Sequence, residues 1–227
     1  MIYKNLLPLV DFDGLEKLKR TNVAVIGCGG VGAYSVTALA RSGIGSLILV
    51  DPDAIEAGNI NRQLMAFHST LGTLKTEWLK AHIQDINPDI HVDAWPVAYE
   101  ASLNEKLFAL KPDYIIDAID DMPAKKALIE AALDRNVPII SVLAQGNRIG
   151  SGTMMHTTLP KTTYDPIARR LRQHFKRHPK YKTIEVIIND APVDIPPDGA
   201  GCVASTIFSP AMAGLKAAET IIKKVIL

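Results

Sequence analysis

The sequence predicts an α/β protein with a Rossmann-like, mostly parallel sheet and helices on both of its faces. Short β-branched apolar runs alternate with segments of helical periodicity through the first 145 residues, which is the pattern of right-handed βαβ units. A glycine-rich segment joins the first apolar run to the first helical segment, as in turns that bind phosphate groups. Both observations favour strands that are covered on two sides.

Five predicted strands and four predicted helices make up this half. The strands are short apolar runs, which lie at 22–27, 46–51, 91–97, 113–120 and 137–144. The helices repeat apolar residues at three- and four-residue spacing, and they lie at 33–43, 74–86, 102–110 and 123–136. Because a helix fills each connection, we expect neighbouring strands to run parallel.

The pattern changes after Gly146. Residues 148–158 form an extended run with no crossover helix before it, and a further strand is predicted at 183–189. We therefore expect antiparallel C-terminal strands to extend the sheet. Asp165 followed by proline predicts the start of a helix that ends at about His178, and residues 209–226 predict a closing helix.

Composition excludes several classes of protein. The 25 Lys and Arg residues nearly balance the 24 Asp and Glu residues, which leaves a formal charge of +1 and excludes a globally basic nucleic-acid coat. Cys28 and Cys202 are the two cysteines and form no CxxC pair, too few for a disulfide framework or a four-thiolate zinc site. No apolar run approaches the roughly 20 residues of a membrane span, so we expect a cytoplasmic protein.

The glycine-rich segment has the GxGxxG form, with its glycines at Gly27, Gly29, Gly30 and Gly32. Glycines in a strand-to-helix turn let the backbone approach a phosphate group, while the helix N-terminus offers unpaired N–H groups. Asp51 lies 19 residues after Gly32, at the end of the second predicted strand, where a carboxylate accepts hydrogen bonds from ribose hydroxyls. A nucleotide that contains ribose is therefore favoured over a turn that needs glycine only for packing.

The residues after Asp51 favour ATP over NAD. Asn59, Asn61, Arg62 and Gln63 are clustered, and Lys75 opens the next predicted helix. A dehydrogenase has no need for this cluster, whereas Arg and Lys neutralise a triphosphate whose charge moves toward pyrophosphate during displacement. Asp120 follows the fourth predicted strand at the same edge of the sheet, where it could ligate Mg²⁺.

The segments GCGGVG, LVDPDAIEAGNINRQ, GTLKTE and IIDAIDD together resemble the ubiquitin-activating-enzyme-like (ThiF/MoeB/HesA) superfamily of adenylating enzymes over about residues 20–145. The resemblance implies attack of a carboxylate on the α-phosphorus of ATP, which gives an acyl-adenylate and pyrophosphate. It implies one adenylating domain over 1–227, with a nucleotide-binding half at about 20–145 and a half for substrate and dimer contacts at about 146–227. The implied roles are ATP contact for Gly30, ribose binding for Asp51, phosphate contacts for Asn59, Arg62, Gln63 and Lys75, and Mg²⁺ ligation for Asp120.

Residues 161–182 carry eight Lys and Arg residues against a single acidic residue, a local charge of +7 that leaves −6 on the rest of the chain. Such a basic element favours a polyanionic partner such as RNA over a solvated helix face. The segment DPIARRLR and the later EVIINDAPV are similar to the tRNA threonylcarbamoyladenosine dehydratase family, although Asn189 and Asp190 stand where Ser and a nearby Glu are more usual. The predicted RNA contacts are Arg169, Arg170, Arg172 and Arg177.

Three other functions stay open at this point. A sulfur-carrier activator would adenylate a small protein that ends in Gly-Gly, and Cys202 is the thiol available for a thioester or persulfide. An NAD-dependent oxidoreductase would ignore ATP. A nucleotide-binding scaffold without turnover is the third, because the superfamily usually donates an arginine from an N-terminal helix across a homodimer. Here Lys4 lies in that stretch, and no arginine precedes Arg20.

Overall fold

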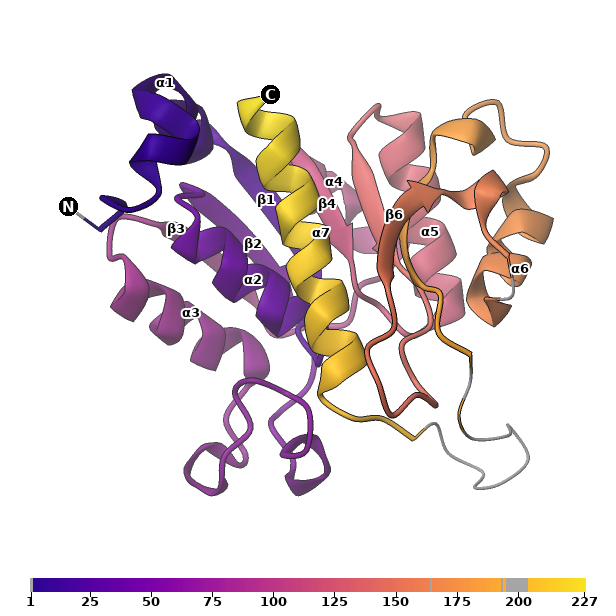
Figure 1. Cartoon of the computed structure of the whole chain (residues 1–227), viewed down its shortest axis with the longest axis horizontal. Coiled ribbons are helices and arrows are strands. Elements are labelled where there is room, and N and C mark those ends of the chain that lie inside the picture. The colour runs from indigo at the N-terminus through magenta and orange to yellow at the C-terminus, as the bar shows by residue number, and fades with distance from the viewer. Residues whose placement is uncertain (1, 164, 193, 195–203) are drawn as a thin grey trace.

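A seven-stranded sheet forms the centre of the molecule (Figure 1). The computed structural model describes residues 2–163, 165–192, 194 and 204–227. The strand order is β3-β2-β1-β4-β5-β7-β6. The strands are β1 (Asn22–Ile26), β2 (Ser46–Val50), β3 (His91–Trp95), β4 (Tyr114–Asp117), β5 (Ile139–Val142), β6 (Met154–Thr158) and β7 (Glu185–Asn189).

Seven α-helices surround the sheet in the described ranges. They are α1 (Leu7–Arg20), α2 (Gly32–Arg41), α3 (Lys75–Ile86), α4 (Asn104–Ala109), α5 (Met122–Asp134), α6 (Pro166–Phe175) and α7 (Phe208–Ile226). Helices α2, α3 and α7 cover one face, and α4, α5 and α6 cover the other (Figure 1). None of these helices is long and apolar enough to cross a membrane.

Strand β1 illustrates why the sheet is buried on both faces. Val23 and Val25 belong to the apolar core under α2 and α7, whereas Ala24 and Ile26 belong to the core under α5. Successive side chains on a strand point to opposite faces, and all four are at most 1% exposed. A continuous apolar run is therefore what a central strand of this sheet requires.

The predicted fold class is confirmed, including the antiparallel extension of the sheet by its C-terminal strands. Strand β6 pairs antiparallel with β7, as expected. Strand β7, however, runs parallel to β5, so only one strand of the described sheet is antiparallel. The physical reason is that α6 lies between β6 and β7 in the chain, and that connection brings β7 back in the direction of β5.

An N-terminal helix, α1, precedes the first strand and was expected only from the resemblance. Tyr3 anchors this end of the chain, because its hydroxyl donates to the Ala40 carbonyl over 3.0 Å and accepts the side-chain N–H of Asn87 over 3.0 Å. Ala40 is near the end of α2, whereas the glycine-rich turn precedes its start. Lys4 therefore lies at the end of α2 that is remote from the glycines of its own chain.

Candidate active site

A cleft of about 580 Å³ opens at the carboxyl ends of β1, β2 and β4, the edge where open α/β sheets bind ligands. Most residues predicted from the sequence line this cleft together, namely Gly27, Gly29, Gly30, Asp51, Asn59, Arg62, Gln63, Lys75 and Asp120. Gly32 is the exception, because it does not line the cleft. The cluster predicted from the sequence is thus a cluster in space.

Two of the four glycines are required by the backbone itself. Gly27 has φ +91°, and a Cβ there would lie 2.6 Å from the Ala118 carbonyl oxygen. A Cβ on Gly32 would overlap the Gly27 carbonyl oxygen, so Gly32 serves close packing at the start of α2. Gly32 does not line the cleft, and its part in nucleotide binding stays a prediction. Among the described residues no side chain caps α2. The Ala33 N–H already donates to the Gly29 carbonyl over 3.1 Å, so an anion at this end would bind the other N–H groups of the first turn.

Asp51 ties the second strand to the glycine-rich turn. Its Oδ2 accepts the backbone N–H of Cys28 over 2.6 Å, and its Oδ1 accepts that of Asp53 over 2.9 Å. The side chain is 6% exposed, and this burial raises the pKa of the carboxyl above its usual value. The carboxylate is held in place beside the cleft, where it can accept a hydrogen bond from a hydroxyl group.

Lys75 supplies a buried positive charge at the start of α3. Its Nζ donates to Asp53 Oδ2 over 2.6 Å and lies 3.8 Å from Asp51 Oδ1, and the residue is 4% exposed. Asp53 also lines the cleft, and its side chain is 60% exposed. The ammonium group is therefore paired with one buried and one exposed carboxylate at the wall of the cleft.

Asn59, Arg62 and Gln63 also line the cleft. Arg62 Nη1 donates to the Gly58 carbonyl over 2.7 Å and to Asn61 Oδ1 over 2.9 Å. Asn59 Oδ1 accepts the Glu56 N–H over 3.1 Å, so this oxygen shapes the turn. Gln63 Oε1 is buried and has no hydrogen-bond partner within the described part of the chain. An unpaired buried polar atom beside a cleft suits a ligand that donates to it.

Asp120 lies where β4 has ended and α5 is about to begin, and its side chain is exposed at the cleft. The neighbouring Asp121 caps α5, because its Oδ2 accepts the Ala124 N–H over 2.9 Å. Within the described ranges, no group of three or more His, Cys, Asp or Glu side chains could hold a metal ion by itself. A divalent cation here would need further oxygen ligands from a bound nucleotide and water.

Tyr99 is a cleft residue that sequence reasoning missed, as it did Asp53. Its hydroxyl donates to Asn104 Oδ1 over 2.6 Å, and burial raises the pKa of Tyr99 to about 12. The phenol is therefore neutral and fixed in position at neutral pH. The DxD spacing at Asp51 and Asp53 was a usable signal for Asp53, whereas a tyrosine after a strand carried none.

Helix α6 and the residues just after it carry the predicted basic side chains, with one difference in exposure. Arg169, Arg170 and Arg177 are exposed. Arg172 is only partly exposed, since its Nη1 donates to the Thr162 carbonyl over 2.8 Å and to the Thr162 hydroxyl. Arg172 therefore holds the segment before the helix in place, a role that the charge pattern did not predict.

The two cysteines stand in different positions. Cys28 is fully buried in the glycine-rich turn, and burial raises the pKa of its thiol well above the usual value. A thiol in that state is a packed side chain and no nucleophile. Cys202, the thiol expected for a sulfur-transfer function, lies outside the described residues.

The chain is similar to the tRNA threonylcarbamoyladenosine dehydratase of Bacillus subtilis, with 40% identity over 178 residues that cover 78% of this chain and 70% of that protein. It is also 32% identical over 173 residues to the molybdopterin-synthase adenylyltransferase of Haemophilus influenzae, covering 74% of this chain and 69% of that protein. The Escherichia coli tRNA N6-threonylcarbamoyladenosine dehydratase, solved in complex with ATP, has a TM-score of 0.91 and 27% identity over 98% of this chain and 93% of that chain. The model of the ThiF family matches residues 3–225. The superfamily predicted from the sequence motifs is thereby confirmed, and the chain belongs to the ThiF family.

Proposed function

We propose that this chain is an ATP-dependent adenylating enzyme whose substrate is the carboxylate of N6-threonylcarbamoyladenosine in tRNA. The observation that carries the proposal is the cleft, which gathers a glycine turn, a buried carboxylate and two cationic side chains in a ThiF-family chain. Its similarity to dehydratases that act on this nucleoside supports the substrate. A tRNA substrate also supports a cytoplasmic location.

Each cleft residue has a task in such a reaction. The amides of the glycine turn and of the α2 N-terminus receive phosphate oxygens, and Asp51 accepts the ribose hydroxyls. Arg62 and Lys75 neutralise the charge that builds up on pyrophosphate as the substrate carboxylate attacks the α-phosphorus. Attack within the activated nucleoside then closes a ring and releases AMP, so the net change is loss of water.

Mg²⁺ fits the cleft as a companion of ATP. Asp120 would hold the ion, since Asp121 caps α5 and Asp53 is paired with Lys75, and its other ligands would be oxygens of the triphosphate and of water. Oxygen ligands of this kind, completed by phosphate and water, are what Mg²⁺ prefers. The ion would supply neutralisation of the triphosphate, while the chain's own residues orient the nucleotide.

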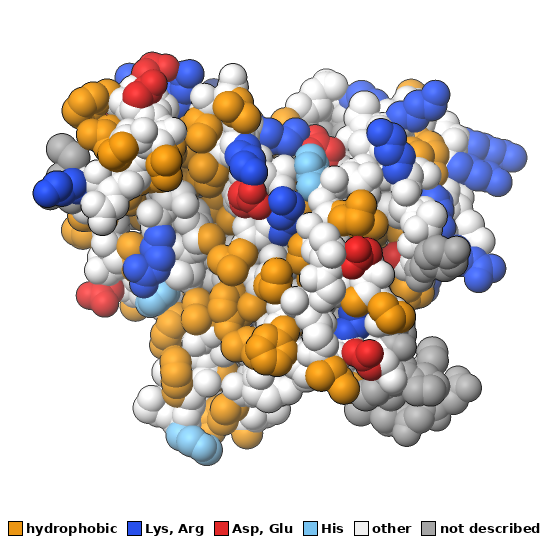
Figure 2. Space-filling model, in the orientation of Figure 1, with side chains coloured by type: hydrophobic (Ala, Val, Ile, Leu, Met, Phe, Trp, Pro, Cys, Tyr) orange, Lys and Arg blue, Asp and Glu red, His pale blue; other side chains and the backbone are white. Residues whose placement is uncertain are grey.

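The surface of α6 supports tRNA as the partner. Figure 2 shows Lys and Arg side chains gathered over the part of the molecule where α6 and the segment after it lie in Figure 1. Exposed basic side chains on one element attract phosphate backbones and give salt-dependent affinity. Arg169, Arg170 and Arg177 are the residues proposed to contact the RNA.

We also propose that the chain forms a homodimer. Apolar side chains on α7 are exposed, with Phe208 at 57%, Met212 at 42% and Leu215 at 49%, and Figure 2 shows apolar side chains across this face. A contiguous apolar surface of this kind is typical of an interface. Because Lys4 lies far from the glycine turn of its own chain, a role for it at the nucleotide would require a second copy.

One reaction tests the proposed function against its rivals. The protein is mixed with ATP, Mg²⁺ and total tRNA, and AMP release is measured together with the mass of the modified nucleoside. We expect AMP and a mass decrease equal to one water. Pyrophosphate exchange that needs a small protein ending in Gly-Gly would instead favour the sulfur-carrier reaction. The similarity to the molybdopterin-synthase adenylyltransferase supports this alternative. Binding of NAD in preference to ATP would reject both.

Asp120→Ala tests the proposed metal ligand within the same assay. We expect the variant to fold and to lose ATP–pyrophosphate exchange, because the triphosphate would lack its cation. Retained exchange would remove Asp120 from the mechanism.

A further inference from the structure

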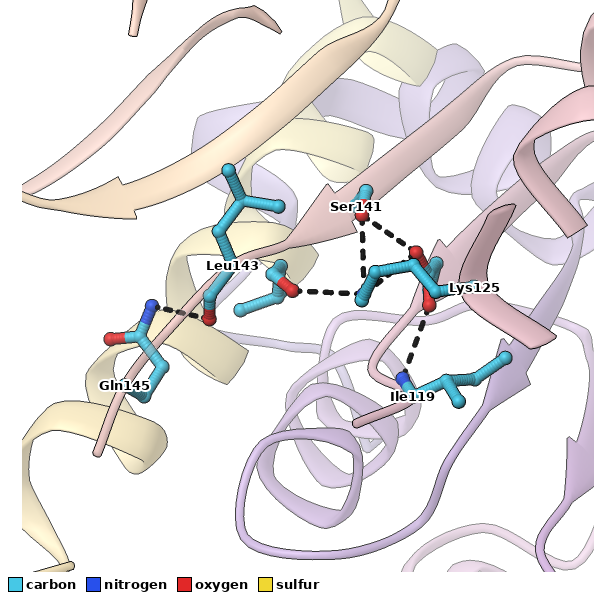
Figure 3. A network of polar contacts seen from close by, with 7 residues as sticks. Ile119, Lys125, Ser141, Leu143 and Gln145 are labelled. Atoms are coloured by element: carbon cyan, nitrogen blue, oxygen red, sulfur yellow. Dashed lines mark hydrogen bonds and ion pairs between the residues drawn. The ribbon is translucent and has the colours of Figure 1, made fainter. Parts of the chain in front are cut away.

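Three polar side chains form a fully buried network behind the cleft (Figure 3). Lys125 Nζ donates to Asp117 Oδ2 over 2.8 Å, to Ser141 Oγ over 3.2 Å and to the Val142 carbonyl over 3.1 Å. Ser141 Oγ in turn donates to Asp117 Oδ2 over 2.6 Å. Lys125, Asp117 and Ser141 are all 0% exposed. All three N–H donors of the ammonium group are therefore used.

Lys125 has no direct path to a bound nucleotide. It does not belong to the described residues that line the cleft, and its donors are occupied by the protein. Stability alone is a poor explanation for the network, because a buried ion pair loses about as much free energy in desolvation as it gains by attraction. The second oxygen of Asp117 indicates another role.

Asp117 connects the network to the cleft. Its Oδ1 accepts the backbone N–H of Ile119 over 3.1 Å, which fixes the turn that follows β4. Ala118, Ile119 and Asp120 of this turn line the cleft. The Ala118 carbonyl also lies against Gly27, since a Cβ on that glycine would be 2.6 Å from its oxygen. The turn thus touches the glycine loop and carries the proposed metal ligand.

We propose that Lys125 is a positioning residue that acts through Asp117. By holding the Asp117 carboxylate in one orientation, Lys125 fixes the 117–121 turn, and with it the placement of Asp120 toward the magnesium–nucleotide complex. The proposal rests on the proposed function for the identity of that ligand. It assigns no proton transfer or substrate contact to Lys125 itself.

Lys125→Met tests the proposal, because methionine has a similar length and no charge. We expect the hydrogen exchange of the Ile119 amide to become at least about tenfold faster, and the Kd for ATP with Mg²⁺ to rise about 10–100-fold, as for other residues that orient metal ligands. The Kd for ATP without Mg²⁺ should change much less. Both quantities are measured on the purified whole chain by exchange mass spectrometry and calorimetry.

Leu128→Ala is the matched control. Leu128 lies on the same helix, is 0% exposed and packs in the apolar core, so its truncation lowers the melting temperature without touching the network. We expect its Mg²⁺-dependent affinity and the local exchange at Ile119 to stay at wild-type values. A Lys125→Met variant that is merely less stable, with wild-type affinity for ATP and Mg²⁺ and slow exchange at Ile119, overturns the proposal.

Ser141→Ala keeps the proposal testable if Lys125→Met does not fold. This variant removes one hydroxyl and keeps the ion pair, so we expect a smaller change in the same direction, about threefold in the Kd with Mg²⁺. No change in either quantity would count against the positioning role. If the wild-type chain binds no ATP, the proposed function fails, while hydrogen exchange at Ile119 still decides whether Lys125 fixes the turn.

Discussion

The nucleotide cleft and helix α6 are two candidate binding surfaces that are built in opposite ways. In the cleft, Asp51 and Lys75 are almost fully buried and are fixed by hydrogen bonds. On α6, Arg169 and Arg170 stand exposed on a helix. A buried site depends on the placement of each group, whereas an exposed basic face depends mainly on the number of its charges. Substitutions should therefore affect the two regions in different ways.

The largest effect is expected for Lys75→Met in the cleft. The substitution leaves the buried Asp51 carboxylate without its cationic neighbour, and it removes the positive charge of Lys75 that would neutralise the phosphates of ATP. We expect ATP–pyrophosphate exchange to fall at least about 100-fold and the free energy of unfolding to fall by about 2 kcal/mol. Lys80→Met on the same helix is the control and should retain exchange. Comparable activity in the two variants would break the contrast between the regions.

Gly27→Ala should have the next largest effect. The residue has φ +91°, and a Cβ would lie 2.6 Å from the Ala118 carbonyl oxygen, so the turn must open. We expect a loss of about 1–3 kcal/mol in the free energy of unfolding together with weaker ATP binding, measured by denaturant unfolding and calorimetry. Gly58→Ala is the matched control, because a Cβ there meets no described atom within 4 Å.

The double substitution of Arg169→Glu and Arg170→Glu tests the exposed basic surface of α6. We expect tRNA affinity to fall and the slope of log affinity against log salt to become shallower, by about 0.7–0.9 for each phosphate group that the variant no longer neutralises. Stability should stay within about 0.5 kcal/mol. A salt slope equal to wild type in the double variant would leave α6 without an RNA role.

Arg172→Gln should behave like a cleft variant. We expect a decrease of about 1–2 kcal/mol in the free energy of unfolding, because the substitution removes the hydrogen bond to the Thr162 carbonyl.

The smallest effect concerns pH and the cap of α6. Burial raises the pKa of the Asp165 carboxyl, which accepts the Ala168 N–H over 2.8 Å. The folded chain therefore holds this proton more tightly than the unfolded chain does. The stabilisation that comes from this tighter protonation is complete below the aspartate pKa of the unfolded chain. It is lost as the pH rises through the higher pKa of the folded chain. Relative to Asp165→Asn, which also caps a helix, wild-type unfolding free energy should decline across that interval. A constant difference would contradict the raised pKa.

Much of this architecture could be predicted because its signals are local in the chain. The strand runs, the glycine turn and the cluster from Asn59 to Gln63 each lie within one continuous segment. The direction of β7 could not be read from its own residues, since it depends on the path of the chain through α6. The sequence also does not distinguish Gly32, which serves packing, from Gly27, which serves a left-handed turn next to the cleft.

The polar network next to the candidate site was not predicted, because its residues come from elements that are far apart in the sequence. Lys125, Asp117 and Ser141 come from a helix and two strands, and the sequence offers no sign that one ammonium group joins them. Asp117 and Lys125 are eight positions apart, but they lie on different elements, so their spacing does not indicate an ion pair. Ser141 required knowledge that β5 lies beside β4. The RNA contact of Arg172 stays a prediction, and its hydrogen bond to the Thr162 carbonyl is an additional role that counting charges does not reveal.

The pairing of Lys75 with Asp53 has a consequence for how a nucleotide enters. The ammonium group in this wall of the cleft carries no unpaired charge, because the solvent-facing Asp53 carboxylate and the buried Asp51 carboxylate both lie beside it. An arriving phosphate therefore displaces an internal counter-ion instead of meeting a naked cation. Because the Lys75 charge is already paired, it attracts a distant phosphate only weakly, so nucleotide capture should respond weakly to ionic strength, in contrast to capture of a polyanion by the exposed arginines.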